Sequence, residues 1–393
     1  MTARVVDVAG LSEPFTVRNG TKQGCVLAPL LFNIFYAAML LDAFHSSDPG
    51  IDVHYRTDGG IFNLRRLAAK SKITELLARD LLYADDCALA AHSLEDAQII
   101  TDCFARAAKR FGLTLSIKKT EVLRQVQPST SPEVSNINVG DAALQFVDKF
   151  CYLGSIISSD GSLDGEISQR IAKASAAFGQ LRNRLWNEDG VHLRTKIDVY
   201  RAVVLSILLY SCETWTIYRR HIHSLDKFHL RCLRQITGIK WQDKIPNTEV
   251  LQRCEMTGIE AFLMQAQLRW SGHLVRMPDT RLPKAIFYSQ LSSGSRPCGH
   301  PVKRYKDSLK KSLQQCNIDP ATWETTAQDR SLWRCSCVTG ISSFERQCIS
   351  ELQLKIERRL ASTSLHSLTT APSVDEDVLP PSDYTHTLRT HKH

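Results

Sequence analysis

The chain has 393 residues, of which 43% are apolar and 23% are charged, and its formal net charge is +8. These totals exclude a chain that is disordered throughout, and the length exceeds one typical domain, so we expect two or three globular units. The positive charge favours polyanionic partners, although charge alone is a weak indication.

The apolar segments are too short for a membrane span. The densest run, 202–210, has nine residues, whereas a spanning helix needs roughly 20. The first residues lack a positively charged stretch followed by an apolar core, so they do not form a secretory signal. The 12 cysteines, mostly isolated in apolar surroundings, indicate reduced thiols. We therefore expect a soluble intracellular protein, nuclear or cytoplasmic, with no membrane partner.

The first predicted elements are a buried helix and a hairpin. In "TKQGCVLAPLLFNIFYAAML", apolar residues are nearly continuous after Pro29. A helix tolerates proline in its first turn, so this segment predicts a buried helix. The next segment, "IDVHYRTDGGIFNLRRL", alternates apolar and polar residues around Asp58-Gly59-Gly60. That alternation around a turn sequence predicts a β-hairpin.

Two adjacent carboxylates stand between apolar runs in "LLYADDCALAA", 81–91. The apolar flanks predict a second hairpin with Asp85 and Asp86 at its turn. Carboxylates that project together make a hard oxygen site for Mg²⁺, and two metal ions held in this way stabilise both the attacking and the leaving oxygen in nucleotidyl transfer. From these residues alone, a solvated Asp-Asp turn is the competing interpretation.

A helix and further strands follow the two carboxylates. Ser93 precedes Asp96 by three residues, and apolar residues then recur at helical spacing until Gly112, which predicts a capped amphipathic helix. The segments "LTLSIKKTEVL" and "FVDKFCYLGSIIS" have strand patterns. Through Gly161 the chain therefore predicts an α+β fold.

Helical patterns take over after Gly161. Apolar residues from Ile167 to Leu185 alternate steps of four and three, and further helical patterns cover 195–215, 222–237 and 258–276. Four basic residues lie off the first stripe, where they either contact phosphates or form a solvated face: Arg170, Lys173, Arg182 and Arg184.

A second basic segment, "SRPCGHPVKRYKDSLKK", has six Lys or Arg residues against one Asp. Because opposite charge is scarce there, nucleic-acid binding is slightly favoured for its basic residues, Lys303, Arg304, Lys306, Lys310 and Lys311. Trp270 and His273 either stack on a base or belong to the core, and the core is the more common outcome for such a tryptophan.

Four stretches occur in the order of known sequence motifs. "NGTKQGCVLAPLLFNIF", "YADD", "FGLTLSIKKTEVL" and "FCYLGSIISSDG" resemble successive motifs of reverse transcriptases, most of all those of LINE-type, non-LTR retrotransposons of the RTE-like group. The segments "YRAVVLSILLYSCETW", "LRWSGHLVRMPDTRLPK" and "IDPATWETTAQDRSLWR" resemble the C-terminal region of the same polyproteins. The resemblance covers nearly all of residues 10–348.

The resemblance implies a right-hand polymerase palm that binds an RNA template and a DNA primer. Asp85 and Asp86 would be catalytic and would hold Mg²⁺, with Asp85 as the more direct ligand. Gln23, Gly24 and Tyr83 would lie near the incoming nucleotide. Lys119 would face the departing pyrophosphate, unless it is a solvated lysine at a strand end. "CYLGSII" would be a hairpin that steadies the primer end, although Tyr152 and Leu153 also suit an ordinary core.

The resemblance also implies four segments. Residues 1–161 would be a partial palm, 162–290 a helical thumb and connection, and 291–360 a basic helical C-terminal region. Residues 361–393 are rich in Ser, Thr and Pro, which predicts a disordered tail.

The family has further parts that this sequence does not match. A complete palm has another metal-binding aspartate upstream of the Gln-Gly motif, together with fingers, and related elements have an endonuclease. Asp7 is the sole aspartate upstream of Gln23, and its surroundings resemble a different strand. Loss of one group from a catalytic unit commonly costs several orders of magnitude in rate. We therefore expect little or no polymerase activity from this chain alone. The alternatives are a noncatalytic nucleic-acid-binding remnant and a relic without function.

Overall fold

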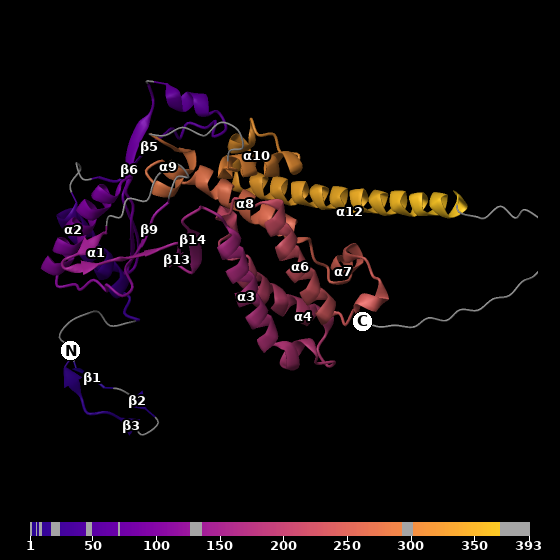
Figure 1. The fold of residues 1–393 in the computed structure, drawn as a ribbon, viewed down its shortest axis with the longest axis horizontal. Helices are drawn as coiled ribbons and strands as arrows, with labels where there is room; N and C mark the ends of the chain where they lie inside the picture. The colour runs from indigo at the N-terminus through magenta and orange to yellow at the C-terminus, as the bar shows by residue number, and fades with distance from the viewer. Residues whose placement is uncertain are drawn as a thin grey trace, which may run out of the picture. The chain divides into compact units, whose positions relative to one another are not determined.

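The structure is a computed structural model that describes residues 2–4, 6–7, 10–16, 24–44, 49–69, 71–125, 136–292 and 302–369. It contains both helices and short strands, so the predicted α+β class is correct (Figure 1). The chain divides into two units, Met1–Phe344 and Glu345–His393. All contacts described below lie within the first unit.

Helices α1 (Ala28–Ala43) and α2 (Leu94–Arg110) enclose a small apolar core. Met39 and Ala43 of α1 pack with Ile100, Phe104 and Ala107 of α2. The predicted cap of α2 is present, because the Ser93 hydroxyl accepts a hydrogen bond from the Asp96 N–H over 3.0 Å. This layer lies next to the hairpin that carries Asp85 and Asp86.

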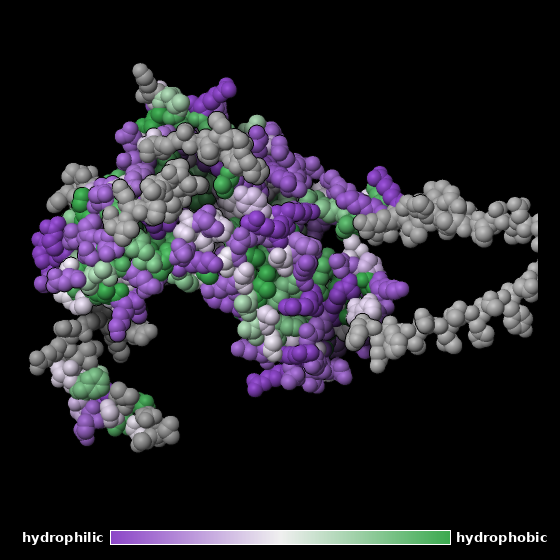
Figure 2. Space-filling model, in the orientation of Figure 1, coloured by the Kyte–Doolittle hydropathy of each residue, from purple (hydrophilic) through white to green (hydrophobic). Residues whose placement is uncertain are grey.

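Most of α1 is exposed, so the prediction of a buried helix is wrong. Leu30, Leu31, Ile34 and Leu41 are between 53% and 78% exposed. Figure 2 shows apolar surface in the part of the molecule where Figure 1 draws α1. The apolar run makes the helix apolar on all sides, whereas α2 packs against one side of it. The sequence pattern identifies apolar residues but does not supply the partner that would cover them.

The hairpin predicted around Asp58-Gly59-Gly60 is also not formed. Strand β5 (Ile51–Tyr55) pairs instead with β6 (Thr74–Ala78), and β15 (Gln290–Leu291) pairs with the other edge of β5. Asp58 forms ion pairs with Arg56 and Arg66 at 2.7 and 2.8 Å. These bonds hold the intervening residues as a wide loop, with a short 3₁₀ helix, η1 (Leu64–Ala68), inside it.

Two hairpins agree with their predictions. Strand β7 (Asp80–Tyr83) pairs with β8 (Asp86–Leu89), and β13 (Lys149–Tyr152) pairs with β14 (Ser155–Ser158). The remaining strands pair as β1 with β4, β2 with β3, β10 with β11, and β9 in parallel with β12. Their bounds are β1 Thr2–Ala3, β2 Val6–Asp7, β3 Gly10–Leu11, β4 Phe15–Thr16, β9 Glu121–Leu123, β10 Asn138–Val139, β11 Ala142–Ala143 and β12 Gln145–Val147.

A larger core lies among the helices after residue 162, as the helical patterns predict. Helix α3 (Asp164–Gln180), helix α6 (Arg219–Ile236) and helix α8 (Ile259–Arg276) contribute to it, and Tyr200 and Leu233 are fully buried in it. The other helical segments are η2 Arg182–Trp186, α4 Leu193–Val199, η3 Tyr200–Leu205, α5 Ser206–Leu208, η4 Cys212–Thr214, η5 Trp241–Asp243, α7 Asn247–Arg253, α9 Leu282–Tyr288, α10 Tyr305–Gln315, α11 Trp323–Gln328 and α12 Arg330–Thr369.

A glycine in α8 allows Trp333 of α12 to lie directly on that helix. A Cβ atom added at Gly272 would overlap with Trp333 Nε1. The same indole N–H donates a hydrogen bond to the Leu268 carbonyl over 3.1 Å. This contact gives a structural reason for the glycine in "RWSGH".

Helix α12 continues to Thr369, so it includes residues 361–369 of the segment expected to be a disordered tail. Residues 370–393 lie outside the described part of the chain. Within that described part, no helix has the length and apolarity needed to cross a membrane.

Candidate functional site

The two adjacent carboxylates lie at the tip of the β7–β8 hairpin. Tyr83 pairs with Asp86, which leaves Ala84 and Asp85 as a two-residue turn. Ala84 has a φ of 53°, and the left-handed region costs a residue with a Cβ about 1–2 kcal/mol. Asp85 and Asp86 are both exposed. Two carboxylates therefore project from a strained turn at the end of paired strands.

Two phenols flank this turn from different elements. Burial, and then the Asp85 charge, raise the pKa of Tyr36 on α1. Burial raises the pKa of Tyr152 on β13, and the charges of Cys87 and Asp86 add to the effect. The Tyr152 hydroxyl also donates a hydrogen bond to the Leu81 carbonyl over 3.1 Å. Both rings therefore remain protonated at neutral pH, and Tyr152 joins the two hairpins.

The two carboxylates at the hairpin tip suit a hard divalent cation, but they are only two of the ligands that such an ion needs. Carboxylate oxygens are the protein ligands that Mg²⁺ prefers, and this ion keeps several waters or phosphate oxygens in its shell. Across the described ranges, no three His, Cys, Asp or Glu side chains come together as a metal site. Asp85 and Asp86 would thus supply two carboxylates to the ion, and bound phosphates or water the rest.

The other residues assigned to the nucleotide have different surroundings. Gly24 has a φ of +84° and a Cβ there would meet no atom within 4 Å, so its backbone conformation, not crowding, favours glycine. Tyr83 is 66% exposed beside the turn. Lys119 is exposed in a turn before β9, where its N–H donates to the Ser116 carbonyl, so the long strand predicted there is absent. Gln23 lies outside the described residues.

The tip of the β13–β14 hairpin is held by side chains of the helical part. Leu153 and Gly154 form its two-residue turn with φ values of 49° and 83°, as in the turns that favour hairpins. The Tyr210 hydroxyl donates to the Leu153 carbonyl over 3.0 Å, and Arg170 donates to the Gly154 carbonyl over 2.6 Å. The turn therefore has a fixed position relative to α3.

Arg170 is buried, so its assignment to nucleic acid is wrong. Its side chain is 4% exposed, and its Nε donates to Glu166 over 2.6 Å. The second carboxylate oxygen of Glu166 accepts the Ile156 N–H over 2.6 Å. The guanidinium lies 4.4 Å from the centre of the Tyr210 ring. All of this places Arg170 inside the protein, where no phosphate reaches it.

The ion pair between Glu166 and Arg170 was not predicted, although the spacing of the two residues in the sequence indicates it. Glu166 and Arg170 are four residues apart, which puts them on the same face of a helix. Lys173 and Arg182, by contrast, are exposed on and just after α3, as a phosphate contact requires. Trp270 is half-buried and His273 is exposed, with ring centres 5.6 Å apart.

The second basic segment is partly used by the fold. The Lys306 amine donates to the Ser289 carbonyl over 2.8 Å, and burial lowers its pKa to about 8. The Lys303 amine donates to the Ile217 carbonyl over 3.0 Å. Arg304 is the residue before α10, and its backbone N–H donates to Asp307. Lys306 is therefore mainly a structural residue. The Lys303 ammonium group has three N–H donors and uses one of them for Ile217, so the other two can bind a ligand.

Comparisons with known proteins agree with this arrangement. Residues 2–157 match the family described as reverse transcriptase (RNA-dependent DNA polymerase). A transposon-derived protein of Caenorhabditis elegans that is itself uncharacterized is 24% identical over 261 residues, which are 65% of this chain and 93% of the worm protein. A Drosophila melanogaster protein named "Probable RNA-directed DNA polymerase from transposon BS" is 25% identical over 272 residues, which are 67% of this chain and 27% of the fly protein. The matched range includes the β7–β8 hairpin.

Proposed function

We propose that this protein, which is a reverse transcriptase-like retrotransposon protein, binds an RNA template paired with a DNA primer and holds Mg²⁺ at Asp85 and Asp86. The element of origin would be a LINE-type, RTE-like retrotransposon. The supporting observation is the pair of adjacent exposed carboxylates at the tip of the β7–β8 hairpin, Asp85 in the turn and Asp86 at the start of β8, inside the matched range. Adjacent carboxylates repel each other, and a divalent cation relieves that repulsion.

Each neighbouring residue has a role that follows from its chemistry. The bound metal would polarise phosphate oxygens and activate the primer hydroxyl. Gly24 permits close approach of the backbone to a nucleotide, and Gln23 offers both a donor and an acceptor. Tyr83 exposes its ring beside the turn, where it contacts the nucleotide. Lys119 supplies positive charge to the leaving pyrophosphate.

The two hairpins and the helical part would each contact a different portion of the nucleic acid. Residues 1–161 form a partial palm, in which the β13–β14 hairpin steadies the primer end. Residues 162–290 form a thumb whose exposed Lys173 and Arg182 contact phosphates, and residues 291–360 form a basic helical region that includes Lys303 and Arg304. Such contacts are independent of sequence and sensitive to salt.

A noncatalytic nucleic-acid-binding role is the second candidate. It is favoured by one observation: among the described residues, Asp85 and Asp86 do not belong to any group of three His, Cys, Asp or Glu residues that could hold a metal ion. Two carboxylates leave metal ions under-coordinated, and incomplete catalytic units commonly lose several orders of magnitude in rate. We therefore expect template–primer binding from the chain alone, with weak or absent extension.

Primer extension on a homopolymer RNA template with Mg²⁺ separates the two candidates. Asp85→Asn should abolish any extension that the unmodified chain shows. Asp141→Asn is the matched control, because Asp141 also lies in a two-residue hairpin turn, between β10 and β11, and is exposed. No extension by the unmodified chain, together with binding that weakens steeply with salt, would identify the noncatalytic role. Undetectable or salt-independent binding would contradict both candidates.

A further inference from the structure

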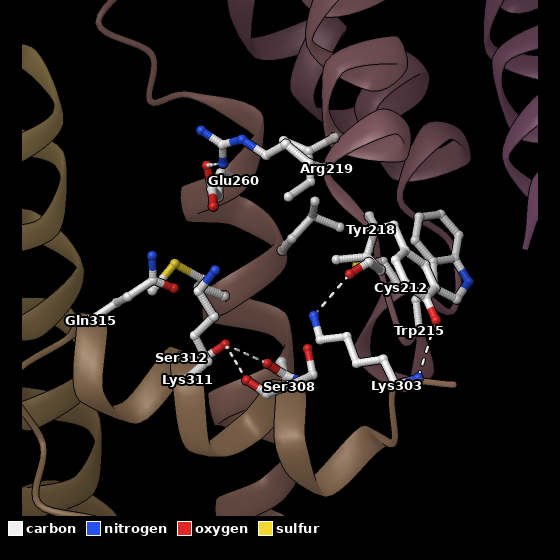
Figure 3. A pocket seen from close by; sticks show the side chains of 15 residues that line it. Cys212, Trp215, Tyr218, Arg219, Glu260, Lys303, Ser308, Lys311, Ser312 and Gln315 are labelled. Atoms are coloured by element: carbon white, nitrogen blue, oxygen red, sulfur yellow. Dashed lines mark hydrogen bonds and ion pairs between the residues drawn. The ribbon is translucent and has the colours of Figure 1, made fainter. Parts of the chain in front are cut away.

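A small cavity in the helical part lies where three helices begin. It has a volume of about 160 Å³, much more than the roughly 10–15 Å³ that one water molecule needs. Figure 3 shows its lining, with Arg219 and Glu260 on one side and Lys303, Ser308 and Lys311 on the other. The cavity is separate from the Asp85–Asp86 turn, since no residue of that hairpin lines it.

The helix ends around the cavity make it electropositive. Helix α6 begins at Arg219, α8 at Ile259 and α10 at Tyr305, and the first turn of each contributes to the wall or lies directly beside it. The N–H groups at a helix start carry a partial positive charge. The first turn of α6 has no acidic residue to offset it, whereas the first turns of α8 and α10 contain Glu260 and Asp307. The start of α6 therefore adds to the charge of the basic side chains.

The side chains add more positive than negative charge. Arg219, Lys303 and Lys311 line the cavity together with one carboxylate, Glu260, and Glu260 is paired with Arg219 at 2.6 Å. Burial lowers the pKa of Lys303 and the nearby Lys311 charge lowers it further, while the charges of Asp307 and Glu260 act in the opposite direction. Two like charges that face each other over a cavity repel, and a bound anion relieves that repulsion.

A buried hydroxyl completes the donor set. Ser308 is 6% exposed and lines the cavity, and its hydroxyl makes no hydrogen bond to any residue that the structure describes. The nearby Ser312 differs, because its hydroxyl donates to the Gln267 side chain over 2.7 Å. The Ser308 hydroxyl can therefore donate to an oxygen of a ligand in the cavity.

We propose that this cavity binds a phosphate group, held by Lys303, Lys311 and the Ser308 hydroxyl. A phosphate offers several oxygens to donors that approach from different sides, and its negative charge matches the two ammonium groups. The phosphate belongs either to a nucleic-acid backbone or to a free anion. The first source rests on the proposed function, whereas the second does not.

Calorimetric titration of the full chain with inorganic phosphate, at constant ionic strength in chloride, tests the site directly. Lys311→Met should weaken binding roughly tenfold, because it removes a charge-assisted hydrogen bond. Lys310→Met is the matched control, since Lys310 is its exposed neighbour on α10 and does not line the cavity. Glu260→Gln should tighten binding, because it removes the one carboxylate and frees Arg219. No phosphate binding by the unmodified chain, or equal effects of the two lysine variants, would overturn the proposal.

Binding of an RNA–DNA duplex as a function of salt then identifies the source. If the cavity holds a backbone phosphate, Lys311→Met should reduce the slope of log affinity against log salt by about one more than Lys310→Met does. Equal slopes, with phosphate binding lost in Lys311→Met alone, would support the site and assign it to a free phosphate. Phosphate binding without any duplex binding would support the site while contradicting the proposed function.

Discussion

Helices α1 and α8 are both rich in apolar residues, yet they differ in what covers them. Two of the 16 residues of α1 are buried, Met39 and Ala43, whereas ten of the 18 residues of α8 are buried. Helix α8 packs against α6, α9, α10 and α11, and α2 packs against α1. An apolar helix thus becomes a core element only where the chain places partners on several of its sides.

The same contrast separates the two parts of the candidate polymerase. The part that carries Asp85 and Asp86 consists of small sheets and one helix pair, while the helical part has a continuous core. The β13–β14 hairpin connects them through Arg170, Tyr210 and Tyr152. The part that carries Asp85 and Asp86 therefore depends on the helical part for its position.

The largest expected effect comes from breaking that connection. Arg170→Met should lower the free energy of unfolding by about 3–5 kcal/mol, because it leaves the Glu166 carboxylate buried without its partner. The matched control is Arg253→Met, which breaks an ion pair of the same spacing, Arg253 with Glu249 at 2.5 Å, that is about half exposed. That change should cost less than about 1 kcal/mol. Urea unfolding measures both, and equal costs would show that the hairpin is not held as described.

Acid should weaken the helical core through His229. Burial lowers the pKa of this histidine from its usual 6.5 to about 4. The unfolded chain takes up a proton below about pH 6.5 and the folded chain only near pH 4, so stability is present above 6.5 and is lost as the pH falls toward 4. The loss amounts to about 3 kcal/mol. The neutral His229 ring accepts a hydrogen bond from the Tyr200 hydroxyl over 2.9 Å and donates one to the Thr257 carbonyl over 3.3 Å.

Unfolding measurements at pH 7 and pH 4 check this prediction. His229→Gln removes the titrating group, so its stability should change less with pH than that of the unmodified chain, by about the same 3 kcal/mol. The comparison within each variant cancels the cost of the substitution itself. An unchanged dependence on pH in the variant would show that His229 is not the titrating group.

A substitution at Gly272 tests how closely Trp333 of α12 packs against α8. Gly272→Ala should destabilise the protein by about 1–3 kcal/mol, because the new methyl group occupies the place of the Trp333 ring. Gly179→Ala in α3 is the control, since a Cβ there meets no atom within 4 Å. Alanine should instead stabilise that helix by about 0.5–1 kcal/mol. Thermal or urea unfolding followed by circular dichroism would reveal the opposite signs, and the same sign for both would contradict the contact.

The smallest expected effect is on α1. Leu30 is 56% exposed, so Leu30→Ala should change stability by less than about 0.5 kcal/mol. Leu268 of α8 has no exposed surface, and Leu268→Ala should cost about 2–5 kcal/mol. A cost above about 2 kcal/mol for Leu30→Ala would mean that the exposed face of α1 is covered in solution. Size-exclusion chromatography would then show whether a second copy covers it.

Local patterns predicted the elements that are held by local bonds. The Asp85–Asp86 hairpin, the Ser93 cap and the helices after Gly161 each follow from turn chemistry or periodicity within a short segment. The β13–β14 hairpin, by contrast, was expected only from the family resemblance, because the local pattern of that segment predicted one strand. The pattern around the two carboxylates was sufficient to place Asp85 in a turn, with Asp86 directly after it.

Contacts between distant segments could not be predicted in this way. The burial of Arg170 depends on Glu166 but also on Tyr210, which is 40 residues further along the chain. The pairing of β5 with β15 joins His54 to Gln290, and no local pattern contains that information. The cavity wall likewise comes from three helices that meet only in the folded protein.

The loop at Gly60 forms a hydrogen bond whose partner is made much later during synthesis of the chain. Its N–H donates to Glu324, 264 residues later, and the Tyr288 hydroxyl donates to the same carboxylate. At roughly 5–20 residues per second, a ribosome needs on the order of 10–50 s to make the intervening chain. For most of that interval, until β15 at Gln290–Leu291 has been made, one edge of β5 lacks its partner strand and is open to wrong pairing. The nascent chain is therefore most in need of a chaperone before its last quarter leaves the ribosome.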